Sequence, residues 1–63
     1  MKVVVNSDTV NLRTGPDKKY PTNGQVHRGD EFTIVDVKNE HGLLKSRAGW
    51  INLKFCIKKE ENE

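Results

Sequence analysis

The residue types most often used in catalysis are one cysteine and two histidines, and their positions do not favour catalysis. Cys56 lies between Phe55 and Ile57 in an apolar stretch, where a thiol is usually inert packing rather than an activated nucleophile. His27 and His41 are well separated and have no cysteine or second histidine nearby, which does not match the spacing of metal ligands. We therefore expect no metal site, and we expect both histidines to be surface residues beside turns.

Carboxylates and glycines give no better candidate for chemistry. Asp30 and Glu31 are adjacent, so on a strand their side chains point to opposite faces. No glycine-rich phosphate loop is present, and a chain of 63 residues leaves little volume for a pocket that excludes water. The sequence therefore predicts a protein that is not itself an enzyme and that uses no cofactor.

Residues suited to binding are easier to find. Tyr20 lies in a polar loop, where its flat ring either provides contact area for a ligand or folds back as a lid over the end of the domain. Asn11 and Arg13 alternate with apolar residues, so they project from the outer face of a strand. Lys38 adds positive charge near the same loops. These four residues, with Trp50 as a structural plug or a partial platform, are the predicted ligand contacts.

Two alternatives remain open for the basic residues. Lys18 and Lys19 either flank a groove and attract carboxylates or serve only solubility. Arg13 pairs either with a carboxylate of a ligand or with Asp17 or Glu31 of the domain itself.

Composition limits the expected partners. The net charge is only +2, and the aromatic residues are two Phe, one Trp and one Tyr, which does not make the basic and aromatic surface typical of nucleic-acid binding. No apolar run approaches the roughly 20 residues of a membrane span, and residues 1–5 are too short for a signal peptide. One cysteine cannot form an internal disulfide, so the cysteine count does not distinguish an oxidising from a reducing compartment. We expect a monomer that does not insert into membranes.

Strands rather than helices are expected. Apolar residues do not recur at helical spacing, whereas short alternating stretches lie between turn residues. This pattern predicts an all-β fold, a small barrel of five to seven short antiparallel strands. The expected strands span residues 3–5, 10–13, 24–27, 31–37, 43–46, 49–52 and 53–57. Residues 1–57 are the expected domain, and residues 58–63 are expected to form a charged, flexible tail.

Three details of this fold are also predicted. The first strand, residues 3–5, is expected at an edge of the sheet. Phe32 faces the core while Val35 and Val37 fall on the other face, which implies a bulge, a strong bend or burial on both sides. Trp50 and Phe32 are expected to fill the interior, so that truncating either one destabilises the fold most.

Three segments together resemble motifs of the bacterial SH3-like (SH3b, Src-homology-3) domain family. Residues 10–16 resemble its opening motif, residues 26–30 its turn of a basic residue followed by glycine, and residues 48–51 its late Gly-Trp motif. Their order and spacing agree over residues 8–57, which is most of the chain. The sequence departs from the pattern at Leu43, where the family often has a tryptophan.

The resemblance implies a noncatalytic module that binds peptidoglycan through its peptide stem or its cross-bridge. Such modules target an attached hydrolase, for example an amidase or a muramidase, or a surface protein to the bacterial envelope, and they occur in phage endolysins. The implied location is extracellular or at the cell wall, as part of a larger secreted or phage-released protein. Two other functions remain open, namely a protein–protein interaction domain without wall affinity and a small nucleic-acid-binding barrel.

Overall fold

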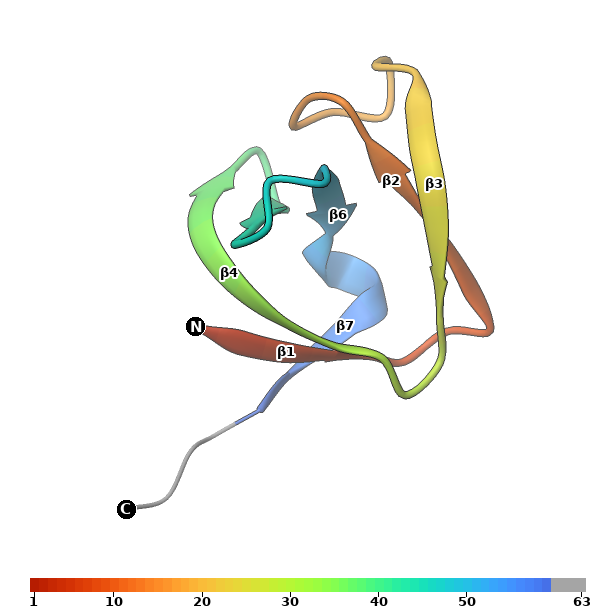
Figure 1. Cartoon of the computed structure of the whole chain (residues 1–63), viewed down its shortest axis with the longest axis vertical. Coiled ribbons are helices and arrows are strands. Elements are labelled where there is room, and N and C mark those ends of the chain that lie inside the picture. The colour runs from red at the N-terminus through yellow and green to blue at the C-terminus, as the bar shows by residue number, and fades with distance from the viewer. Residues whose placement is uncertain (60–63) are drawn as a thin grey trace.

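The computed structural model describes residues 1–59, which form seven strands and one short 3-10 helix. All strand pairs are antiparallel, so the predicted all-β fold is confirmed. The elements, shown in Figure 1, are β1 (Lys2–Val5), β2 (Thr9–Arg13), β3 (Thr22–His27), β4 (Glu31–Lys38), β5 (His41–Leu44), β6 (Trp50–Asn52), η1 (Leu53–Phe55) and β7 (Cys56–Lys59).

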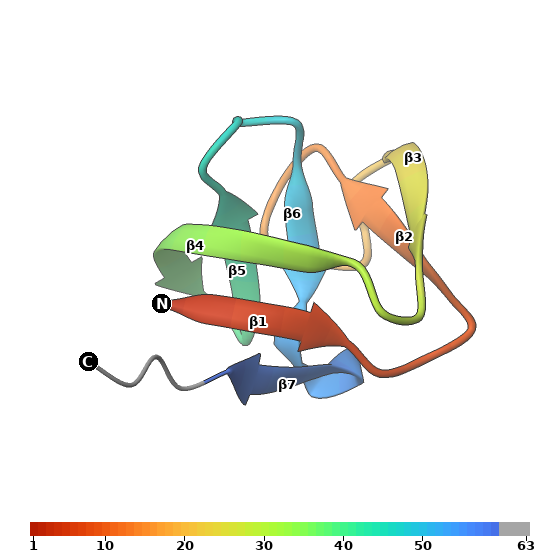
Figure 2. The ribbon, with the colours of Figure 1, turned by 60° about the horizontal axis from the view of Figure 1, so that its bottom comes forward.

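The strands form one sheet in the order β3-β2-β6-β5-β4-β1-β7. β1 therefore lies between β4 and β7, and the predicted edge position of this strand is wrong. The edge strands are β3 and β7, which do not pair with each other in residues 1–59, so the sheet is strongly curved but not closed into a barrel. Figure 2 shows how β4, β1 and β7 run across the direction of β5 and β6. This crossing lets the sheet enclose a core between its two halves.

The curvature is concentrated in β4, the longest strand. Its pairing with β5 shifts register between Ile34 and Asp36, which is the bulge that the pattern of apolar residues allowed. Ile34 is buried, whereas Val35 and Val37 are 48% and 51% exposed. Burial on both sides of this strand is therefore excluded. A bulge sharpens the local twist, and here it carries β4 from β1 over to β5.

The core consists of small aliphatic side chains rather than aromatic ones. Ile51 is completely buried, but its neighbour Trp50 is only half-buried, as is Phe32. Because side chains alternate along a strand, Ile51 facing the core requires Trp50 and Asn52 to face outward, so the prediction that Trp50 fills the interior is wrong. The buried hydrophobic residues are Val3, Val5, Val10, Leu12, Val26, Ile34, Leu44 and Ile51.

The closing segment is a helical turn followed by a strand, not the single strand expected over residues 53–57. The side chain of Asn52 accepts a hydrogen bond from the backbone N–H of Lys54 at 2.9 Å, which caps η1. β7 then runs to Lys59 beside β1, two residues into the segment expected to be a flexible tail. Residues 60–63 of that expected tail lie outside the described residues.

Gly49 permits the close approach of β6 to β2. A Cβ atom at this position would lie 2.9 Å from the carbonyl oxygen of Arg13, a distance that only glycine avoids without moving the backbone. The contact places Arg13 opposite Trp50 in the register of the two strands. Gly49 thus joins the hairpin of β2 and β3 to the rest of the sheet.

A two-residue turn joins β4 and β5. Lys38 pairs with His41, so only Asn39 and Glu40 form the loop, and both have positive φ angles, 52° and 64°. Positive φ at both central positions is typical of a type I′ turn, which favours Asn followed by Gly. Asn39 suits its position, whereas Glu40 has a Cβ where glycine is preferred.

Glu40→Gly is expected to stabilise the fold by about 1 kcal/mol, because it removes the cost of a left-handed conformation from a residue with a side chain. Glu40→Gln, which removes the charge but keeps the Cβ, is the matched control and should leave stability nearly unchanged. Urea unfolding followed by tryptophan fluorescence measures both. Equal stability of the two variants would contradict this account of the turn.

Candidate functional site

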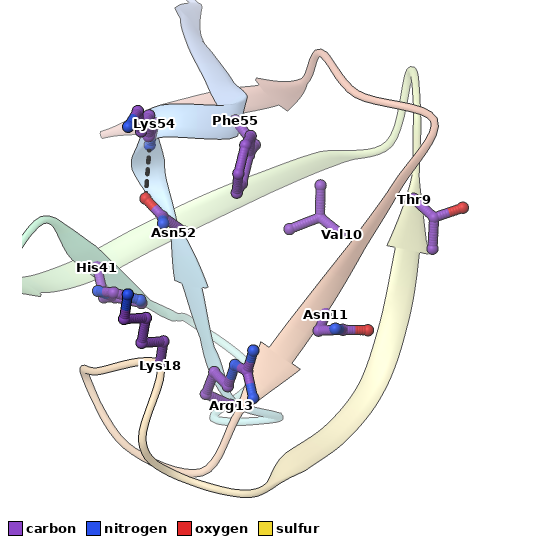
Figure 3. A pocket seen from close by; sticks show the side chains of 9 residues that line it. All are labelled: Thr9, Val10, Asn11, Arg13, Lys18, His41, Asn52, Lys54 and Phe55. Carbon is purple, nitrogen blue, oxygen red and sulfur yellow. Dashed lines mark hydrogen bonds between the residues drawn. The ribbon is translucent and has the colours of Figure 1, made fainter.

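A polar cleft lies between the hairpin of β2 and β3 and the end of β6 (Figure 3). Its volume is about 370 Å³. One wall is β2, the other is the end of β6 with η1, and the loop that follows β2 closes one end. The lining residues are Thr9, Val10, Asn11, Arg13, Lys18, His41, Asn52, Lys54 and Phe55.

The loop of residues 14–21 is held in place by the turn between β4 and β5. The side-chain amide of Asn39 donates to the carbonyl oxygen of Pro16 at 3.1 Å and to a carboxylate oxygen of Asp17 at 2.9 Å. At the base of the loop, the N–H of Thr14 donates to the carbonyl of Pro21 at 3.0 Å. These bonds fix the loop over the cleft, where Lys18 is one of the lining residues.

The carboxylate of Asp17 organises the tip of this loop. It accepts hydrogen bonds from the backbone N–H of Lys19 at 3.2 Å and from the side chain of Asn39. The bond from the Lys19 backbone, helped by the charge of Lys19 and by Asn39, holds the pKa of Asp17 below its ordinary value of 3.8. The ionised carboxylate is thus the form that the loop requires.

Tyr20 folds back onto its own loop rather than over the end of the sheet. A Cβ atom on Gly15 would lie 2.6 Å from the tyrosine ring, so the ring packs directly on the glycine. The ring remains 38% exposed, and the Lys19 ammonium lies 5.8 Å from its centre. Tyr20 contributes to the cleft indirectly, because its carbonyl oxygen accepts a hydrogen bond from Nη1 of Arg13 at 3.2 Å.

Asn11 and Arg13 are the two predicted contacts that line the cleft. Asn11 is exposed, and its side-chain oxygen accepts from Gln25 at 3.0 Å. Arg13 is half-buried. Within residues 1–59 Arg13 has no carboxylate partner, since Glu31 pairs with Lys59 at 2.9 Å and Asp17 with Asn39.

Lys38 and Trp50 lie outside the cleft. Trp50 is two residues before Asn52 on β6, so both side chains are on the same face of the sheet. Trp50 is half-buried and lies opposite Arg13 in the register of β2 and β6. Lys38 ends β4 and is exposed next to the turn.

His41 was expected at the surface, and that expectation is wrong. The residue begins β5, is only 7% exposed and lines the cleft together with Lys18 of the loop. Its Nδ1 lies 2.9 Å from the carbonyl oxygen of Asn39. A carbonyl only accepts hydrogen bonds, so Nδ1 carries a proton and Nε2 is the remaining polar atom of the ring.

Sequence reasoning also missed the part of the cleft that η1 supplies. Lys54 is exposed and Phe55 is 44% exposed, and the helical turn brings both into the lining of the cleft, with Phe55 on the side of Val10 and Lys54 beside Asn52 (Figure 3). An asparagine two residues before Lys54 was the available signal, since Asn side chains commonly cap the backbone two positions later. The largely apolar pattern of residues 53–57 favours a continuous strand, which is why the helical turn was not predicted.

Groups for nucleophilic or metal chemistry are not gathered here. Burial raises the pKa of the Cys56 thiol, which is the opposite of the activation that a nucleophile needs. Across residues 1–59, no three His, Cys, Asp or Glu side chains meet as metal ligands would. No helix in this part of the chain has the length and hydrophobicity needed to cross a membrane.

Comparisons with known proteins give no identification. No protein-family model, curated protein or solved structure matches this chain.

Asn39→Gly is expected to loosen the loop without unfolding the sheet, because glycine suits the positive φ but removes both side-chain bonds. The expected loss is about 1 kcal/mol, with faster hydrogen exchange at the amides of Lys19 and Tyr20. Asn23→Ala is the matched control, since it removes a comparable 2.7 Å bond to the carbonyl of Ala48 elsewhere. Equal exchange in both variants would contradict the role given to Asn39.

Acid should release the same loop only below pH 3.8. Because the pKa of Asp17 is lowered in the folded protein, the carboxylate stabilises the loop above the ordinary value and this stabilisation is lost as the pH falls through the lowered pKa. The amide shift of Lys19 in an NMR titration reports the change. A midpoint at or above 3.8 would show that the hydrogen bonds to Asp17 do not persist in solution.

Proposed function

We propose that this chain is a noncatalytic module that binds peptidoglycan and holds an attached hydrolase or surface protein at the bacterial cell wall. The proposal rests first on the resemblance of three segments to bacterial SH3-like domains. The first of these segments, residues 10–16, contains Arg13 and lies next to the loop that closes the cleft. One of the three segments that carry the resemblance therefore contributes residues to the cleft.

The cleft is the observation that carries the proposal. The side chains of Asn11 and Asn52 offer amide N–H donors suited to a peptide backbone, while their oxygens already accept hydrogen bonds within the domain. Phe55 of η1 adds an exposed apolar surface to the cleft. The cleft is partly open to solvent, as a site must be when the ligand is a short branch of a large polymer. Stem peptides of peptidoglycan have this form.

Weak binding suffices for such a role. A module that engages the wall makes the next encounter between the wall and its attached partner intramolecular, which raises the effective concentration of that partner. The proposal therefore places the protein outside the cell, at the wall, and requires no cofactor.

Purified cell walls should retain the isolated chain in a pull-down at low salt. Arg13→Gln should reduce retention about tenfold, because a charge-assisted hydrogen bond with a ligand is lost. Lys45→Gln is the matched control, since Lys45 is exposed on the far turn and carries the same charge. Failure of walls to retain the unaltered chain would overturn the proposed function. Equal retention of both variants would show that the binding site lies outside the cleft.

Binding of single-stranded nucleic acid is a second candidate, favoured by one observation. Phe55 is exposed in a cleft that also contains Arg13, Lys18 and Lys54, and stacking on an aromatic ring beside cations is how many proteins hold single strands. Retention on single-stranded DNA that falls steeply with salt, combined with no retention by walls, would favour this candidate instead.

A further inference from the structure

The charged side chains that line the cleft are all basic. Arg13 comes from β2, Lys18 from the loop and Lys54 from η1, and no aspartate or glutamate is among the lining residues. Within residues 1–59, neither lysine ammonium pairs with a carboxylate. Three like charges from separate segments therefore face one hollow, where the surrounding protein focuses their field.

The guanidinium of Arg13 is positioned by one hydrogen bond and keeps other N–H donors for a ligand. Its Nη1 is engaged by the carbonyl of Tyr20, and the half-buried position restricts the side chain. A guanidinium has five N–H donors in a planar fork, so most of them remain for another acceptor. Planar two-oxygen groups, a carboxylate or a phosphate, match this fork best.

His41 adds a ring nitrogen to the same hollow. Its Nδ1 proton is committed to the carbonyl of Asn39, which leaves Nε2 as the ring atom that a hydrogen-bonding group of a ligand can meet. A ligand that combines an anionic end with an amide would use both kinds of group. A peptide that ends in a carboxylate has this combination, and an uncharged glycine bridge lacks the anion.

We propose that the cleft of Arg13, Lys18 and Lys54 selects an anionic oxygen group of the wall, a carboxylate or a phosphate, over the uncharged cross-bridge. This inference rests on the proposed function and names the class of ligand. Two wall components supply such groups, namely the carboxylates of stem peptides and the phosphates of anionic wall polymers.

Four probes in NMR titrations separate these possibilities. They are a stem peptide with a free terminal carboxylate, the same peptide as its terminal amide, short glycerol-phosphate oligomers and oligoglycine blocked at both ends as its N-acetyl amide. We expect the free acid or the phosphate oligomer to bind about tenfold more tightly than the amide and oligoglycine. Whichever of the two anionic probes, the free acid or the phosphate oligomer, binds more tightly identifies the source of the anion.

Paired variants test the location of the site. Lys18→Gln combined with Lys54→Gln should weaken anion binding about tenfold. The control combines Lys45→Gln with Lys58→Gln, which changes the net charge equally but outside the cleft. The control should weaken anion binding less than about twofold. Glu40→Gln should strengthen it about twofold, because Glu40 shares a hollow with Lys54. All these side chains are exposed, so the fold should be kept, and one-dimensional NMR spectra check this.

The outcomes distinguish the two proposals. If walls retain the chain but the amide and oligoglycine bind as well as the anions, the selection of an anion is overturned and the proposed function stands. If the free acid or phosphate binds in the cleft but walls do not retain the chain, the anion site stands and the wall function fails. Equal weakening by both lysine pairs would show that only diffuse charge attracts the ligand, and would overturn the site.

Discussion

The candidate site depends on the hydrogen bonds that Asn39 makes. Its amide holds Pro16 and Asp17, while its own carbonyl accepts the proton of His41. One residue therefore joins the turn between β4 and β5 to the loop after β2 and also sets the tautomer of the buried histidine. These bonds hold the loop that closes one end of the cleft and that carries Lys18.

The composition of the core explains why aromatic side chains are available at the surface. Valine, leucine and isoleucine fill the interior, and Phe32, partly buried, packs against them. Phe55, Tyr20 and Trp50 are each at least partly exposed. Exposed aromatic rings beside polar groups cost stability in a small domain, and they provide contact area at low entropic cost for a ligand.

Alternation of apolar and polar residues was enough to predict strands and most of their positions, because strands such as β1 and β2 bury every second residue in the core. It could not decide which face of β6 is buried, since Trp50 and Ile51 are both hydrophobic. The burial of His41 depends on a loop distant in sequence, which no local pattern contains. Asn11 and Arg13 were found because they project from a strand with a clear alternation, whereas Lys54 and Phe55 were missed because a capped helical turn interrupts an apolar stretch.

The proposed function at the cell wall depends on a ligand binding in the basic cleft that three segments assemble. Its most direct test is an NMR titration of the isotopically labelled chain with soluble fragments released from purified walls. Amide shifts confined to Arg13, Lys18, His41 and Lys54, saturating together, are the predicted result. Shifts centred on the exposed face of β4 at Val35 and Val37, or an unchanged spectrum with every fragment, would contradict the assignment.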